Sequence, residues 1–403
     1  MKRNALPTLS TLALVGILAG CPAGEEVTIG VVLNETTITP EVAQSVRRGI
    51  ELGLEAVQAD PDQPYTIALD IRDANGDAGT VAEELYDAGA IGVVGGISTE
   101  DALAIADVAN REGRVFITPT ALSDELSGIS RTFFRIALTN RQEASAMANF
   151  ATETLDVDEL VILAAEDRAF TDSLLEDLRT VFGQYGGNVK EIIHFGSEDD
   201  LATVAEQAVA LEPTGVYIAA YSPQIAGLVK ALRDQGYGLT EGKKEWIMTT
   251  SVFTHPAILE QAGPSVNGVY LTMSAFDTSA ETPPMSDFVA AYRERHGTDP
   301  DVWAGHGYDS ILLVGAALKA STNTLPQEFL KGMRAMDPLT GVTGNIQFDE
   351  EGNVQKFARI HMIRDGKLVD YRVWYESRME EIKRRMEQLK RETTRLHTET
   401  GDS

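Results

Sequence analysis

The chain has a single cysteine among its 403 residues, which excludes an intrachain disulfide as a source of stability. Its six histidines lack the spacing of a metal site, and no HExxH or Cys/His cluster occurs. Nucleotide-binding and nucleophile-elbow motifs are also missing, and the glycines at 89, 92, 95 and 96 fit close helix–strand packing instead. We therefore expect no metal, no cofactor and no catalytic residues.

Basic residues are scarce: 34 Lys and Arg stand against 61 Asp and Glu, which gives a net charge of -27 at pH 7. Residues 22–375 alone have a net charge of about -29, because the first 21 residues add two positive charges and residues 376–403 are neutral overall. Such a field repels nucleic acid and anionic lipid surfaces. A cationic partner would explain the acidity. A saline environment that screens it is favoured, because the acids are spread along the whole body.

The cysteine ends an N-terminal segment typical of export. Lys2 and Arg3 precede an apolar run at residues 9–18, and Leu-Ala-Gly-Cys follows at 18–21. The segment resembles a bacterial lipoprotein signal, which implies that Cys21 carries the lipid and that the protein is exported and anchored on the periplasmic side of a membrane. An ordinary cleaved signal with an incidental cysteine is the alternative. The run is too short for a transmembrane helix, which needs about 20 apolar residues.

Two series of alternating strands and helices follow. Short apolar runs, typical of strands buried on both faces, occur at residues 27–33, 65–71, 90–94 and 114–117. After a loop, further strands are expected at 159–164, 189–194, 215–219 and 245–248. The pattern predicts an α/β fold of two doubly wound parallel-sheet lobes, with a cleft at the carboxyl ends of the strands.

The expected boundaries divide the chain into six parts. These are a signal at 1–21, lobe 1 at 22–136, lobe 2 at 137–266, a return to lobe 1 at 267–340, closing strands mainly of lobe 2 at 341–375, and a charged helical tail at 376–403.

The tail carries an apolar stripe. Met379, Ile382, Met386 and Leu389 recur at alternating spacings of three and four, and nearly all residues between them are charged or Gln. This is the a/d pattern of a coiled coil, at under three heptads. Two interpretations stay open: a helix that lies against the body or frays, and a homodimer or partner contact through the stripe.

Five segments, in order and at matching spacing, resemble the type I periplasmic binding proteins of the Leu/Ile/Val transporter group. They are GVVGGIST at 92–99, VFITPTALS at 115–123, FFR at 133–135, YDS at 308–310 and TGNIQFDEEG at 343–352. The likeness extends from about residue 27 to 375. It implies two lobes joined by a three-segment hinge that close on a small-molecule ligand, with an ABC permease as partner and no reaction.

The resemblance also implies site residues in lobe 1, which would hold a ligand carboxylate: Ser98, Thr99, Thr120, Ala121, Leu122 and Ser123. The first two stand at an expected helix N-terminus, where free N–H groups favour an anion, although they equally suit a helix cap. Leu122 replaces the family's usual Thr or Ser, so one hydroxyl contact is missing unless Ser123 supplies it. A plain turn after Pro119 is the alternative for this segment.

In lobe 2 the resemblance implies Phe170, Tyr221 and Ser251. The two aromatic rings would cover the ligand on closure, although aromatic residues in these places also suit a core. Ser251 stands where the amino acid binders have an acid that pairs with the ligand ammonium. A buried ammonium without a carboxylate partner binds poorly. An amine-free carboxylate or an amide is thus as good a candidate as an amino acid, unless Glu100, Glu166 or Asp167 substitutes.

The sequence is consistent with three candidate functions. We predict the extracytoplasmic solute-binding component of an ABC transporter. The alternative is a ligand-sensing lipoprotein that signals to a partner through its tail, with no transport role. An enzyme on a similar two-lobed fold is disfavoured, because the sequence offers no catalytic set.

Overall fold

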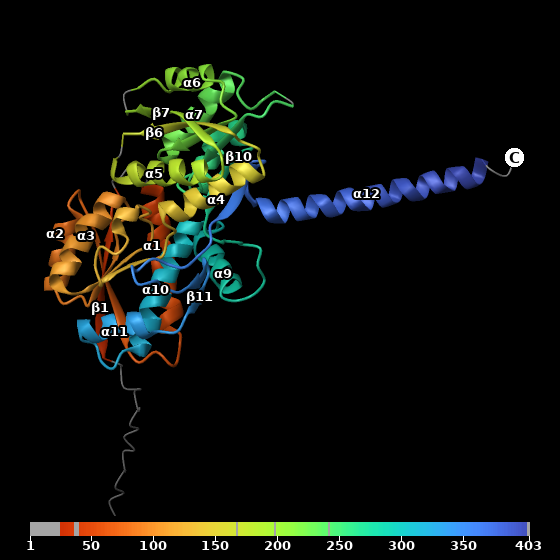
Figure 1. Cartoon of the computed structure of the whole chain (residues 1–403). Helices are drawn as coiled ribbons and strands as arrows, with labels where there is room; N and C mark the ends of the chain where they lie inside the picture. The colour runs from red at the N-terminus through yellow and green to blue at the C-terminus, as the bar shows by residue number, and fades with distance from the viewer. Residues whose placement is uncertain (1–24, 36–39, 167, 197–198, 241, 401–403) are drawn as a thin grey trace, which may run out of the picture.

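The computed structural model describes residues 25–35, 40–166, 168–196, 199–240 and 242–400. They form two lobes, stacked one above the other in Figure 1, and a long helix that leaves them at their junction. Within this part of the chain, no helix is both long enough and apolar enough to span a bilayer.

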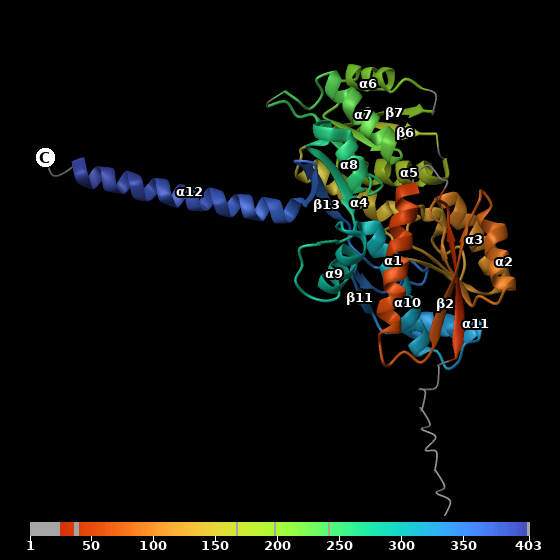
Figure 2. The same ribbon diagram turned by 180° about the vertical axis from the view of Figure 1, so that it is seen from behind.

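Lobe 1 is built on a parallel five-stranded sheet of order β2-β1-β3-β4-β5. Its strands are β1 (Glu26–Leu33), β2 (Thr66–Asp73), β3 (Gly92–Gly95), β4 (Val115–Thr118) and β5 (Phe133–Arg135). The helices of this lobe are α1 (Pro40–Gln58), α2 (Ala78–Asp87), α3 (Thr99–Glu112), α10 (Val302–Ala320) and α11 (Pro326–Ala335). Helices α1 and α10 lie side by side (Figure 2), and a Cβ at Gly49 would stand only 1.9 Å from the carbonyl oxygen of Ala304. Glycine is thus needed there for the two helix backbones to touch.

Lobe 2 is built on a seven-stranded sheet of order β14-β13-β10-β9-β8-β6-β7. Its strands are β6 (Glu159–Ala165), β7 (Asn188–Phe195), β8 (Gly215–Ala219), β9 (Trp246–Thr249), β10 (Val269–Met273), β13 (Arg359–Arg364) and β14 (Lys367–Asp370). Its helices are α4 (Asn140–Glu153), α5 (Arg168–Gln184), α6 (Leu201–Ala210), α7 (Ser222–Asp234) and α8 (Pro256–Ala262). The α/β fold with parallel-sheet lobes is confirmed; β13 and β14, which pair antiparallel, are the exceptions.

The return to lobe 1 begins later than expected. Strand β10 pairs with β9 and β13, so residues 269–273 belong to the lobe 2 sheet, whereas the expected boundary fell at 267. The chain then forms α9 (Met285–His296) and reaches α10. A hairpin of β11 (Leu339–Gly341) and β12 (Gly344–Ile346) precedes the last crossing to β13.

Helix α12 (Tyr371–Thr400) starts where β14 ends, five residues ahead of the expected tail. Its first turn packs on lobe 2, since Tyr371 and Trp374 join the apolar cluster under α4 and Arg364 lies over the Trp374 ring, 5.5 Å from its centroid. Beyond that turn the helix projects away from both lobes (Figures 1 and 2). In this structure the tail therefore does not lie along the body.

Candidate ligand site and hinge

The lobe 1 residues form a compact polar turn at the ends of β3 and β4. Ser98 caps α3, because its Oγ accepts from the Asp101 N–H at 3.1 Å. Thr120 Oγ1 donates to the carbonyl of Ile97 at 2.8 Å and so ties the two loops together. Thr99 is buried and is the first residue of α3. The positive end of the helix dipole therefore lies at this loop.

The two aromatic residues expected in the lobe 2 part of the site lie against each other after β6 and β8. The rings of Phe170 and Tyr221 lie 5.4 Å apart at 33°. Leu122 belongs to the same apolar cluster, and Ser123 Oγ lies 3.4 Å from Ser173 Oγ on α5. The structure therefore brings the end of the lobe 1 loop up to the aromatic pair of lobe 2.

Ser251 meets an acid that the sequence reasoning missed. Its backbone N–H donates to Glu143 Oε2 at 3.3 Å, and the Thr272 hydroxyl donates to the same oxygen at 3.0 Å. Glu143 is fully buried, and burial raises its pKa to about 7, against the smaller lowering effect of these two donors. Because an acid in the first turn of a helix suits the helix dipole, no sequence pattern set Glu143 apart as a site residue.

Two of the three acids considered as substitutes at Ser251 do not lie in a buried site. Glu100 and Glu166 are exposed, while Asp167 lies outside the described residues, as does Cys21. Among the described residues no group of three or more His, Cys, Asp or Glu is placed to hold a metal.

The two lobes touch where the loop after β9 faces the start of α10. His255 Nε2 from lobe 2 lies 3.6 Å from Asp301 Oδ2 of lobe 1, which also accepts from the Ser45 hydroxyl at 2.7 Å. Three polar atoms in this region are buried without a hydrogen-bond partner among the described residues: Thr254 Oγ1, His255 Nδ1 and Trp303 Nε1. Buried polar groups are almost always paired, so these atoms are available to bond a polar ligand or water.

Two buried cationic side chains bond the crossing segments to each other and to the lobe 1 loop. Arg135, at the end of β5, donates from Nη1 to the Ser123 carbonyl at 2.7 Å and so supports the lobe 1 loop. Lys356, between β12 and β13, donates to the Thr343 hydroxyl at 2.7 Å and to the Ile136 carbonyl at 3.4 Å. Burial lowers the pKa of Arg135 to about 10 and of Lys356 to about 8.

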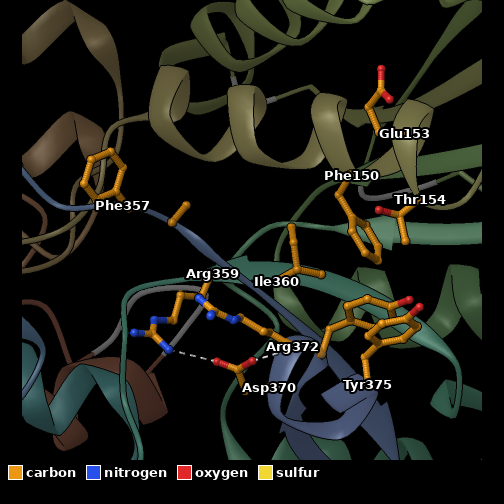
Figure 3. Close-up of a pocket in the computed structure, with 11 residues that line it drawn as sticks. Phe150, Glu153, Thr154, Phe357, Arg359, Ile360, Asp370, Arg372 and Tyr375 are labelled. Atoms are coloured by element: carbon orange, nitrogen blue, oxygen red, sulfur yellow. Dashed lines mark hydrogen bonds and ion pairs between the residues drawn. The ribbon is translucent and has the colours of Figure 1, made fainter. Parts of the chain in front are cut away.

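Two cavities lie close to the hinge. One, of 680 Å³, is lined from both lobes, with Thr254 and Pro256 on one side and Asp301 and Val302 on the other. The other, of 840 Å³, lies between α4, β13 and the root of α12 (Figure 3). None of the nine residues expected in the ligand site lines either cavity.

Two sheets of this strand order, joined by three crossing segments around a polar interface, define a two-lobed binding protein. The chain belongs to the periplasmic binding protein family, whose sequence pattern it matches over residues 26–366. The expected type I fold of the Leu/Ile/Val group is confirmed.

The relatives share this fold at low identity. The Leu/Ile/Val-binding protein homolog 1 of Brucella melitensis biotype 1 is 22% identical over 357 residues, which cover 85% of this chain and 92% of that protein. A leucine binding protein from Thermotoga maritima has a TM-score of 0.78 and 22% identity, over 85% of this chain and 97% of its own. A solute binding protein from R. palustris in complex with benzoate has a TM-score of 0.75 and 18% identity, over 86% and 95%.

Proposed function

We propose that this protein is the extracytoplasmic solute-binding component of an ABC transporter, and that it binds a small polar ligand by closing its hinge. Family membership supports a binding role, and the relatives are named as Leu/Ile/Val-binding, leucine-binding or solute-binding proteins. The observation that carries the proposal for this chain is the meeting of the two lobes at the expected site, where Ser123 Oγ of the lobe 1 loop lies 3.4 Å from Ser173 Oγ of lobe 2, beside the Phe170–Tyr221 pair. A hinge-closing protein places its ligand at such a contact.

The proposed ligand is an amino acid or an amino-acid-like carboxylate or amide. Its acid group would lie at the start of α3 against Ser98 and Thr99 with the 120–123 loop, and Phe170 and Tyr221 would cover its apolar part. Ser251 offers no charge for an ammonium, and Glu143 behind it is held neutral up to about pH 7 by burial. Relatives of this fold hold leucine in one case and benzoate, which has no amine, in another.

We further propose that Cys21 carries a lipid that anchors the exported protein to a membrane. The motif at 18–21 supports this, and the acidic body is suited to a solute carrier that does not itself adhere to anionic lipid. Mass spectrometry of the protein from membranes tests it. A diacylglyceryl mass on a peptide that starts at Cys21 is expected, and a soluble chain with a free thiol would contradict it.

A thermal-shift screen of residues 22–403 tests the binding role. The panel holds amino acids, their deaminated acids, amides and small aromatic acids. A ligand at 100 times its dissociation constant stabilises the native state by about 2.7 kcal/mol. Stabilisation by amine-free compounds alone supports the ligand class that Ser251 favours, whereas turnover of any bound compound would contradict a purely binding role.

A ligand-sensing role, with no transport, is the second candidate. The exposed stripe of α12 favours it, because a transport component needs no such surface. Deletion of residues 376–403 separates the two: uptake that survives the deletion supports transport, and uptake that is absent in the full chain supports sensing.

A further inference from the structure

Helix α12 carries an apolar seam that is largely exposed to solvent. Met386 is 53% exposed and Leu389 is 55% exposed, and Ile382 lies on the same face at 39%. Most helices in proteins are stable because an apolar face packs against something, and this one projects into solvent along most of its length. A partner would therefore stabilise it.

The shape of the seam indicates another helix as that partner. Met379 and Met386 occupy a positions and Ile382 and Leu389 occupy d positions, so only two of every seven residues are apolar. A helix that docks on a globular surface has a wider apolar face, whereas this narrow stripe is typical of a coiled-coil seam.

The charges beside the seam decide between a second copy and a different chain. From residue 378 to 390 every flanking position is cationic: Arg378 and Arg385 at g, Lys383 and Lys390 at e. A parallel copy would bring Arg385 against Lys390, and an antiparallel copy would bring Lys against Lys and Arg against Arg. The acids Glu380 and Glu381 lie on the outer face, where they already pair with Arg384 and Arg378. Self-pairing is thus opposed by like charges.

The seam also leads into a preformed cavity. Tyr375 continues it by one d position, is 48% exposed and lines the 840 Å³ cavity together with Phe150 and Tyr371. Figure 3 shows Phe150 and Tyr375 among the residues that line this cavity, and the Tyr371 ring contacts both, at centroid distances of 4.7 Å and 6.0 Å. A helix that followed the seam would therefore end against aromatic surface on lobe 2.

We propose that α12 is a docking helix for an amphipathic helix of another protein, one with apolar a and d positions and Asp or Glu at its e and g positions. The two helices would form a heterotypic coiled coil that starts at the aromatic cavity. This interaction needs no bound ligand, and failure of the peptide assay would leave the solute-binding proposal standing.

Two labelled synthetic peptides of three heptads test the proposal by fluorescence anisotropy with the full mature chain. Both carry Leu at a and d; one has Glu at e and g, the other Lys. We expect the Glu peptide to bind, with an affinity that falls as salt rises, and the Lys peptide not to bind. Absence of binding by the Glu peptide would overturn the proposal.

Variants of α12 distinguish the contribution of the apolar seam to peptide binding from the contribution of the flanking charges. Met386→Lys with Leu389→Lys should abolish binding of the Glu peptide. The matched control, Ser377→Lys with Gln388→Lys, adds the same charge away from the seam and should keep the affinity within about twofold. Replacement of all four flanking cations by Glu (Arg378, Lys383, Arg385 and Lys390) should transfer binding to the Lys peptide. Equal effects of seam and control variants would contradict the proposal.

Other occupants give distinct results. A dimer of the full chain in sedimentation at micromolar concentration, lost in the seam variant, would mean that a second copy covers the seam. Binding to phosphatidylglycerol vesicles without binding to the Glu peptide would mean a membrane surface. Either result overturns the heterotypic coiled coil.

Discussion

Arg135 and Asn353 join the first and third crossing segments: the guanidinium donates to Asn353 Oδ1 from Nε at 3.2 Å and from Nη2 at 2.5 Å. The same guanidinium holds the Ser123 carbonyl through Nη1, and its side chain is fully buried. One residue therefore links the hinge to the loop expected to bind the ligand.

Replacement of Arg135 by Met should destabilise the protein by about 3 kcal/mol or more. The change leaves buried carbonyls and the Asn353 amide oxygen without donors, at about 1–3 kcal/mol for each unpaired group. Urea unfolding measures the loss. Arg111→Met is the control, because Arg111 pairs with Glu83 on the surface and its loss should cost under about 1 kcal/mol. Equal effects of the two changes would contradict the role of Arg135.

Glu143 should make stability fall as the pH rises from about 4.5 to 7. Its pKa is about 7 in the folded protein and near 4.5 in the unfolded chain, so the folded state binds more protons between these values. Stability from the neutral carboxyl is fully present below 4.5 and lost above 7, a change of about 3 kcal/mol. Glu143→Gln should remove this slope in urea unfolding at several pH values. Parallel pH profiles for the variant and the natural protein would refute the assignment.

The contact of His255 with Asp301 should support closure. Both side chains are largely buried, and the contact joins one lobe to the other. His255→Ala should remove about 0.5–1 kcal/mol of the free energy that favours the closed form. The affinity for the ligand found in the screen should then be about two- to fivefold weaker. Titration calorimetry measures it, with His194→Ala, an exposed change on β7 of the same lobe, as control. An unchanged affinity in His255→Ala would show that the contact plays no part in closure.

Local patterns in the sequence predicted the elements well and predicted contacts between distant segments poorly. The apolar run at 27–33 became β1 (Glu26–Leu33), and Ser98 became the cap of α3, because both follow from neighbouring residues. The pairing of Glu143 with Ser251 and Thr272 depends on how α4 packs over β9 and β10. Likewise, the Asp301–His255 contact exists only once both lobes are folded and adjacent. No periodicity or spacing encodes such contacts.

Glu143 also bears on which ligand the site accepts. Ser251→Glu introduces an acid at the position where the resemblance to amino acid binders implies one, but it places a second carboxyl beside Glu143, whose Oε2 lies 3.3 Å from the Ser251 nitrogen. Two carboxylates this close cannot both ionise without cost. The single variant should therefore be less stable than the natural protein at pH 8, and much of the loss should disappear at pH 5.

Adding Glu143→Gln removes that conflict, so the double variant should recover stability at pH 8. It should also gain stabilisation by free leucine or another α-amino acid in the thermal-shift assay, since the new carboxylate can pair with the ammonium. Stabilisation of the natural protein by amino acids, lost in Glu143→Gln alone, would contradict this view. Glu143 itself would then be the group that pairs with the amine, reached from behind Ser251 as the lobes close.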